Sequence, residues 1–512
     1  MLKFILLFIV VITISYFFKF IGNQFLYYIK KYVPNYAHFS TALEKWAVRK
    51  PKSWRVVKKF TLNLFIATSI ILFLFLFRNY PPLIEIEDIG MDMLLQLHEE
   101  QIQPLQNNKV NAFTFIDIDR KTHEAWEYPT FTPRDKLKAL IQVAAEKNPQ
   151  FIVINIDISR HTPIDKKNGV NIHSSDAQLL KYLKNDFPKL CDNNKNCPKL
   201  IFVKNFKQPS EKKAELYGQV KQFLYTPRTI QRAYSSFLDN VIDNSPHMFW
   251  ATTLYNISSD HVLRRWFLSV PICNVHNEPS LLPSVQLLVS KLSQTDKYET
   301  TYQELTQSTH QCTDNNYYVD NNISRYGNHI LYTMPWKQPL YSDANNFLPR
   351  YRLPYQDGKS IALSVYPAQL LLTNENAINL NNQMVIIGSS NSEFQDMFHT
   401  PLGEMPGSLV IVNSTYSLLQ YGQIKSVNSG YKLILTIITI LIMSILFTFL
   451  HKTIWISLIA GSVVIGIFLF ISMYFFSSGI YLDFLAPLIA IQYQQTISEI
   501  QALKDEIKRL QQ

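Results

Sequence analysis

The sequence is poor in glycine and in charged residues. Only 14 of the 512 residues are glycine, and no Gly-x-y repeat occurs, which excludes a collagen-like fibre. Charged residues make up 17% of the chain, against roughly 25% in an average soluble protein. Hydrophobic residues reach 47%, which excludes a disordered chain and disfavours a purely soluble one. The length allows about three domains.

Several catalytic signatures are missing as well. The sequence contains no Gly-rich phosphate loop, no G-x-S-x-G and no H-E-x-x-H, and its 12 histidines are scattered without ligand spacing. We therefore expect a protein that is not an enzyme and that has no cofactor and no metal site.

Long apolar runs predict about five transmembrane helices. Each of the first four approaches the ~20 residues that a bilayer core requires. The fifth is shorter and contains Asp483 and Pro487, so a re-entrant or interfacial helix is the alternative there, with Asp483 at the interface rather than in an ion relay. The predicted spans are 1–22, 60–77 and, within 431–493, the runs 433–450, 454–476 and 480–493.

A basic loop sets the predicted topology. Residues 23–59 carry nine Lys or Arg against the single acid Glu44, out of a net charge of +10 for the whole chain. Basic clusters beside membrane segments mark the cytoplasmic side and contact anionic lipids. A nucleic-acid face is disfavoured, because no aromatic stacking platform accompanies the charge. We expect 78–430 to lie outside the cytoplasm and the tail 494–512 inside it.

Cysteine is scarce, and all four cysteines fall within 78–430. Disulfides persist in oxidising compartments, which agrees with an external location. We expect Cys191 to pair with Cys197 across the loop CDNNKNC, and Cys273 to pair with Cys312. Four free thiols are the alternative, and the absence of C-x-x-C or H-x-x-x-H spacing disfavours zinc.

The external region begins with alternating elements. Residues 85–97 have helical spacing and predict a helix that leaves the membrane and docks on the domain. Buried strands are predicted at 110–119 and 151–157. Between them, Thr132 is expected as a helix N-cap with Pro133 in the first helical position. A strand, a helix and a strand in this order predict a right-handed parallel crossover.

The rest of the region supports an α/β fold. A further buried strand is predicted at 383–388, followed by a helix over about 409–421. The polar stretch at about 160–250 is expected to form peripheral insertions. Strands of one sheet would then come from distant parts of the chain.

Four stretches in this region are similar to one sensor family. They are FIDID at 115–119 with Pro129, Pro133 and Arg134; VINID at 153–157; DHVLRRW at 260–266 leading to PSLLP at 279–283; and VIIG at 385–388 with Asp396, TPLG at 400–403, MPG at 405–407 and Asn413.

Together they resemble the CHASE family, type two, the sensory extracellular domain associated with bacterial cyclases and histidine kinases. The resemblance covers about 80–495 and implies one helix before the sensor and three after it. The sequence departs from the family pattern after the Pro-Gly pair of the MPG motif. Family members often carry Glu-x-His-Ala there, whereas this chain has Leu409, Ile411 and Val412 in those places. No kinase, cyclase or phosphodiesterase domain follows before Gln512.

Candidate site residues gather at the predicted carboxyl ends of the strands. Ligands of open α/β sheets bind in that crevice. Carboxylates with one arginine suit a cation or a small cationic ligand. The alternative is that these groups cap helices and brace the domain. The candidate ligand-binding residues are Asp117, Asp119, Arg134, Asp157 and Asp396.

The resemblance implies a sensory protein of the bacterial inner membrane with a large periplasmic domain. We expect it to detect an unknown small ligand or an envelope state and to signal through its helices to a separate partner. A non-signalling envelope scaffold is the alternative, and an envelope enzyme a more distant one. Apolar residues in 494–512 follow a-d spacing, which suits pairing in a homodimer or an amphipathic end at the membrane surface.

Overall fold

The structure is a computed structural model in which the domain between the predicted spans is described in most detail. Besides isolated positions or pairs elsewhere, the described residues are 81–101, 112–158, 160–163, 172–192, 197–204, 231–232, 235–258, 260–273, 278–308, 328–336, 351–354, 361–374, 378–391, 396–426, 466–467, 469–475 and 480–481. The chain divides into two units, of which one comprises 92–426 with 477–480 and the other the flanking segments. The larger unit carries the fold described below.

A seven-stranded sheet forms the centre of this unit. Its spatial order is β10-β11-β1-β12-β2-β3-β5, and every neighbouring pair is parallel except β10 with β11. The strands are β1 (Phe113–Asp117), β2 (Phe151–Ile154), β3 (Lys199–Val203), β5 (Met248–Ala251), β10 (Tyr351–Pro354), β11 (Ile361–Pro367) and β12 (Met384–Gly388).

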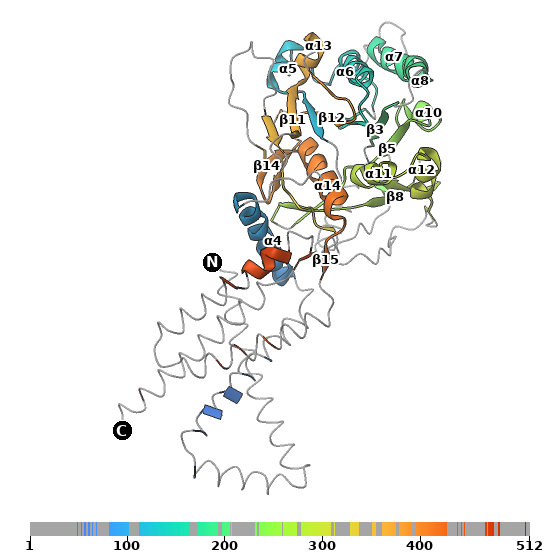
Figure 1. Cartoon of the computed structure of the whole chain (residues 1–512). Helices are drawn as coiled ribbons and strands as arrows, with labels where there is room; N and C mark the ends of the chain where they lie inside the picture. The colour runs from blue at the N-terminus through green and yellow to red at the C-terminus, as the bar shows by residue number, and fades with distance from the viewer. Residues whose placement is uncertain are drawn as a thin grey trace. The chain divides into compact units, whose positions relative to one another are not determined.

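Helices cover both faces of the sheet, as Figure 1 shows. On one face lie α6 (Arg134–Glu146), α7 (Ser174–Lys181), α8 (Phe187–Asp192) and α13 (Ala368–Thr373). On the other lie α11 (Val285–Leu292) and α14 (Gly407–Tyr421).

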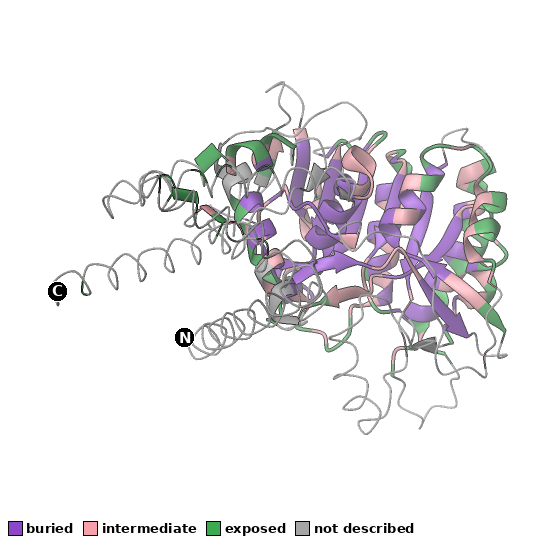
Figure 2. Ribbon diagram, turned by 90° about the horizontal axis from the view of Figure 1, so that it is seen from below, coloured by how far each residue is buried: buried purple, intermediate pink, exposed green. Residues whose placement is uncertain are grey.

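The central strands are mostly apolar because both of their faces are buried. In β2, Ile152 and Ile154 pack on the side of α6, whereas Phe151 and Val153 pack on the side of α14. Figure 2 shows the buried residues concentrated along these strands. One hydrophobic core therefore lies on each face of the sheet. The polar residues at the ends of the strands lie at the edges of the sheet.

Smaller elements complete the described part. They are α4 (Pro81–Gln101), α5 (Arg120–Ala125), the π-helix η2 (Tyr182–Asp186), β4 (Gln231–Arg232), α10 (Asp239–Ile242), β6 (Tyr255–Ile257), β7 (Leu263–Trp266), β8 (Ser269–Cys273), β9 (Pro279–Pro283), α12 (Tyr298–Thr306), β13 (Met397–Thr400), β14 (Gly403–Pro406), β15 (Lys425–Ser426) and β16 (Ile480–Tyr481). Strands β4, β8 and β9 form a second sheet, and β6–β7 and β13–β14 are antiparallel pairs.

The α/β fold with parallel strands is confirmed, but two details differ from the sequence prediction. Strands β1 and β2 are parallel in one sheet, as expected, and β12 lies between them. The stretch 160–250 contributes β3 and β5 to the main sheet, because short apolar runs within it are buried despite their polar surroundings. Helix α6 begins at Arg134 with Pro133 in the capping position, where no side chain caps the helix, so Thr132 is not the N-cap.

The five predicted spans lie outside the described residues, apart from the helical run 469–475, the pairs 466–467 and 480–481, and other isolated positions or pairs. Among the described helices, none combines the length and the apolar character needed to cross a bilayer.

Candidate functional site

The carboxyl ends of three parallel strands meet at one edge of the sheet. Asp117, the last residue of β1, is in register with Gly388, the last residue of β12. The strand β2 ends beside β12 at Ile154, and the N–H of Asn155 donates to the carbonyl of Ile387 at 2.8 Å. The loops that follow these strands therefore occupy the place where open α/β sheets bind ligands.

Asp117 is fully buried and holds the loop that follows β12. The N–H and the hydroxyl of Ser390 donate to its carboxylate at 2.8 and 2.6 Å. The hydroxyl of Ser389 donates to the carbonyl of Ile118 at 2.7 Å. These contacts join the end of β1 to the loop after β12.

Asp119 is the N-cap of α5. Its carboxylate accepts from the N–H of Thr122 at 2.8 Å, which satisfies a donor that has no partner within the helix.

Arg134 belongs to a neighbouring cluster around Asp176. Its guanidinium donates to the main-chain carbonyl of Asp157 at 2.9 Å, and its Nε lies 4.0 Å from a carboxylate oxygen of Asp176. Burial lowers the pKa of Arg134, whereas the charges of Asp176 and Asp157 act in the opposite direction. Asp176 is itself buried and accepts from the N–H and the hydroxyl of Thr162 at 2.8 and 2.6 Å.

Asp396 lies at the start of α14. The side-chain amide of Asn155 donates to its carboxylate at 3.1 Å and to the hydroxyl of Ser408 at 3.0 Å. The N–H of Gly407 donates to the main-chain carbonyl of Asp396 at 2.8 Å. The Asp396 carboxylate occupies the space that a Cβ on Gly407 would need, so only glycine permits this close approach.

Asp396 is the carboxyl group of this edge that is set to titrate near neutrality. Burial raises the pKa of Asp396 from 3.8 to about 7, and the hydrogen bond from Asn155 lowers it only in part. Carboxyl groups shifted in this way are candidates for functional sites when they lie at a strand edge or cleft.

A hairpin connects Asp396 to the helix α4. The strands β13 and β14 run from Met397 to Pro406, directly between Asp396 and Gly407. At the tip of the hairpin, the carbonyl of Pro401 accepts from the side-chain amide of Gln96 on α4 at 3.0 Å. One turn earlier on α4, the Asp92 carboxylate accepts from both Nε and Nη2 of Arg264, at 3.0 and 2.6 Å.

The five predicted residues are thus distributed over several neighbourhoods of the same edge. Asp117 holds the Ser390 loop, Asp119 caps α5, Arg134 binds the main chain at Asp157, and Asp396 binds Asn155. Ligand binding by this set stays a prediction.

Sequence reasoning missed Asn155, Asp176 and Ser408. Asn155 stands within the VINID motif, directly after the end of β2 and two residues before Asp157, and its place in this motif was a signal for it. Asp176 and Ser408 carry no comparable local signature.

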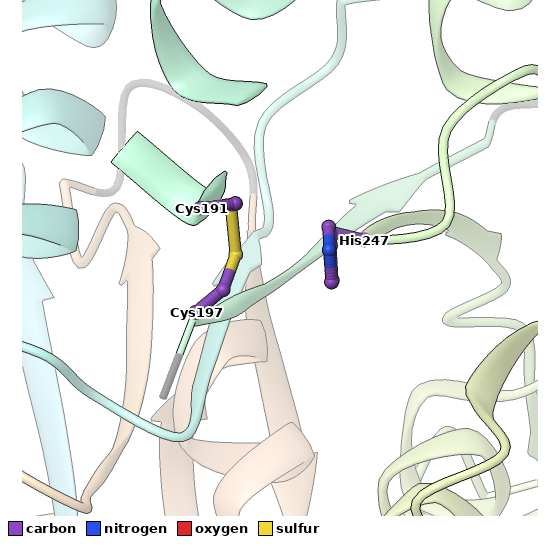
Figure 3. Close-up of side chains that lie close together, drawn as sticks. All are labelled: Cys191, Cys197 and His247. Carbon is purple, nitrogen blue, oxygen red and sulfur yellow. A yellow bond between two sulfur atoms is a disulfide. The ribbon is translucent and has the colours of Figure 1, made fainter. Parts of the chain in front are cut away.

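Both expected disulfides are present. Cys191 pairs with Cys197, and Cys273 pairs with Cys312. Figure 3 shows the first pair beside His247, which precedes β5. The structure thus confirms the expected pairing and excludes the alternative of four free thiols.

The parallel sheet and the two disulfides define a disulfide-bonded α/β domain, and disulfides persist in oxidising compartments. The profile of the CHASE2 domain matches residues 67–447, which is well over half of the chain. The chain therefore belongs to the CHASE2 family, a family of sensory extracellular domains. It matches neither a curated protein nor a solved structure.

Proposed function

We propose that this chain is a sensory protein of the bacterial inner membrane that detects a ligand or an envelope state with its periplasmic CHASE2 domain and signals to a separate partner. The observation that carries the proposal is the continuous series of contacts from Asp396, through the hairpin β13–β14, to α4.

The first step of this series is local. Asp396 and Gly407 are the two ends of the hairpin and are joined by a hydrogen bond between their main chains. A ligand that changes the charge or the partner of Asp396 would alter the position of both ends together. Because Asn155 also binds Ser408, the same change would reach the start of α14.

The second step reaches α4. Asp92 and Gln96 lie four residues apart, on one face of this helix. The hairpin tip binds Gln96, and the buried Arg264 binds Asp92, so both contacts resist a shift of α4. In the sequence α4 follows the predicted span 60–77, which would carry such a shift toward the membrane.

The membrane location rests on the sequence. The five apolar runs and the basic loop 23–59 favour an inner-membrane protein with a periplasmic domain, in contact with anionic lipids. Two disulfides agree with an oxidising compartment. The tail 494–512 is then the proposed contact with the partner or with a second copy of the chain.

The ligand must bind the two states with different affinity, since otherwise it shifts no equilibrium. A cationic ligand does so at Asp396, because it favours the ionised carboxylate over the neutral acid that burial favours. A fall in pH acts in the opposite direction and supplies a simple probe.

The proposal is tested with the full chain in its native membrane. Partners are captured by cross-linking and quantified by mass spectrometry for the wild type, Asp396→Asn, Gln96→Ala and a chain truncated after Tyr493. Glu404→Gln is the matched control, because Glu404 is an exposed carboxylate of the same hairpin. We expect Asp396→Asn and Gln96→Ala to change the yield of the same partner at least threefold, and Glu404→Gln to leave it unchanged.

Loss of that partner on truncation would assign the output to the tail. An unchanged set of envelope partners in all variants would overturn the sensory proposal and leave a scaffold as the function of the domain.

A further inference from the structure

A cluster of two cysteines and one histidine lies at the amino-terminal edge of the sheet, opposite to the edge that holds Asp396. One ligand atom from each of Cys191, Cys197 and His247 lies within 4.8 Å of the others. Figure 3 shows the disulfide with the imidazole beside it. Among the described residues, this is the group of His, Cys, Asp and Glu side chains whose atoms converge in this way.

The fold fixes the relative position of these residues. Cys197 stands two residues before β3, and His247 stands immediately before β5. These strands are parallel neighbours, and the N–H of Leu200 donates to the carbonyl of His247 at 2.9 Å. Cys191 lies near the end of α8, which packs against the face of the sheet that α6 also covers.

His247 supplies a second, independent observation. Its Nδ1 atom is buried and has no hydrogen-bond partner among the described residues. Buried polar atoms are nearly always satisfied, and an exception in a native fold calls for an explanation. Neutral imidazole is the commonest protein ligand of metal ions.

We propose that the reduced form of the Cys191–Cys197 pair, together with His247, binds a thiophilic metal ion, Zn²⁺ or Cu⁺. Two thiolates and one imidazole are a donor set that these ions prefer. The donor atoms around a tetrahedral zinc ion are roughly 3.5–4 Å apart, so the sulfur atoms must separate and the imidazole must approach slightly. A water molecule would complete the coordination of Zn²⁺. The proposal is independent of the sensory function.

The chemistry needs a dithiol reductant, which the proposal takes to be a thiol–disulfide exchange protein of the envelope. The dithiol attacks the disulfide, is itself oxidised to a disulfide, and leaves two cysteine thiols, so two electrons and two protons are transferred. Each thiol then releases its proton to solvent as its sulfur binds the ion. Transfer of two electrons from the two thiolates back to the disulfide form of the exchange protein re-forms the Cys191–Cys197 bond and expels the metal.

The second disulfide provides an internal reference. Cys273 and Cys312 are 39 residues apart in sequence and belong to no convergent group of this kind among the described residues. Reduction of the whole chain therefore creates four thiols, of which we expect the metal to shield two.

The test uses the purified full chain in detergent, reduced under anaerobic conditions and freed of reductant. Co²⁺ serves as the spectroscopic probe, and Zn²⁺ and Cu⁺ as competitors. We expect one Co²⁺ per reduced chain with thiolate-to-cobalt charge-transfer absorption, and no such absorption from the oxidised chain. His247→Ala should weaken binding at least tenfold, whereas His261→Asn, at an exposed turn, should not change it.

A measurement on the wild type makes the result independent of folding in the variants. Bound Zn²⁺ should protect Cys191 and Cys197 from alkylation while Cys273 and Cys312 react. Absence of Co²⁺ binding, equal binding by the oxidised chain, unchanged binding in His247→Ala, or protection of the other pair would each overturn the proposal.

Discussion

At the scale of single residues, Asp396 has the most distinctive environment. Its carboxyl group is removed from water at the start of α14 and accepts one hydrogen bond from Asn155. Burial favours the neutral acid, whereas an ordinary exposed aspartate is ionised at neutral pH. This one group therefore couples the protonation of the carboxyl edge to the stability of the domain.

The replacement Asp396→Asn should remove this coupling. The pKa is about 7 in the folded chain and 3.8 in the reference state, so the folded form binds more protons between these values. The wild type should lose stability as pH rises through this window, while the neutral amide should not. Between pH 5 and 8 we expect the variant to gain roughly 2–3 kcal/mol relative to the wild type.

Denaturant unfolding of the full chain in detergent at the two pH values measures this difference. Glu404→Gln is the control: it removes only an exposed pair with His399, so its effect should differ by less than about 1 kcal/mol between the two pH values. If the difference in the free energy of unfolding between Asp396→Asn and the wild type is the same at both pH values, Asp396 is ionised in the folded chain.

At the scale of elements, α14 joins the candidate site to the rest of the domain. Its residues from Gly407 to Ser417 are all buried, including polar ones, so the helix is a core element rather than an amphipathic surface helix. Asn413 is its main polar contact. It accepts from the N–H groups of Thr333 and Met334 at 3.0 and 2.9 Å and donates to the carbonyl of Met334 at 3.0 Å.

Asn413→Ala should therefore destabilise the domain by about 2–4 kcal/mol, because it leaves several buried main-chain groups without partners. Ser414→Ala, a substitution at an equally buried neighbour on the same helix, should cost about 1 kcal/mol. Thermal unfolding of both variants shows which substitution causes the larger loss of stability. A larger loss in Ser414→Ala would contradict the role assigned to Asn413.

Prediction from sequence worked well at this scale where the signal was local. The strands β2 and β12 are continuous apolar runs and β1 is largely apolar, because both faces are buried, and such runs are visible in the sequence. It failed for β3 and β5, since four- and five-residue apolar stretches inside a polar segment carry little periodicity. It also misplaced the cap of α6, where tertiary contacts of Arg134 hold the helix start without a capping side chain.

At the scale of the whole molecule, the two disulfides constrain loops of very different length. Cys191 and Cys197 are 6 residues apart, whereas Cys273 and Cys312 are 39 residues apart. A longer closed loop removes more conformational entropy from the unfolded chain.

Replacement of Cys273 and Cys312 by serine should accordingly lower the stability by about 4 kcal/mol, and replacement of Cys191 and Cys197 by about 2 kcal/mol. Denaturant midpoints of the two double variants, without added metal, measure the two effects. Equal losses, or a larger loss from the short loop, would mean that packing rather than loop closure dominates.

The sequence by itself determined the features that depend on neighbours along the chain. These are the buried strands β1, β2 and β12, the pairs of cysteines and the family motifs, whereas the spans and the oxidising compartment stay predictions from the sequence. Each follows from local periodicity, composition or a short pattern of residue types.

Only the tertiary structure decided which distant segments meet. It placed β12 between β1 and β2, brought Asn155 to Asp396 across 241 residues, and set His247 beside Cys197. The physical reason is that the order of strands in a sheet depends on how the whole chain buries its apolar faces. Local propensity carries no information about that order, and the chemistry at both edges of the sheet follows from it.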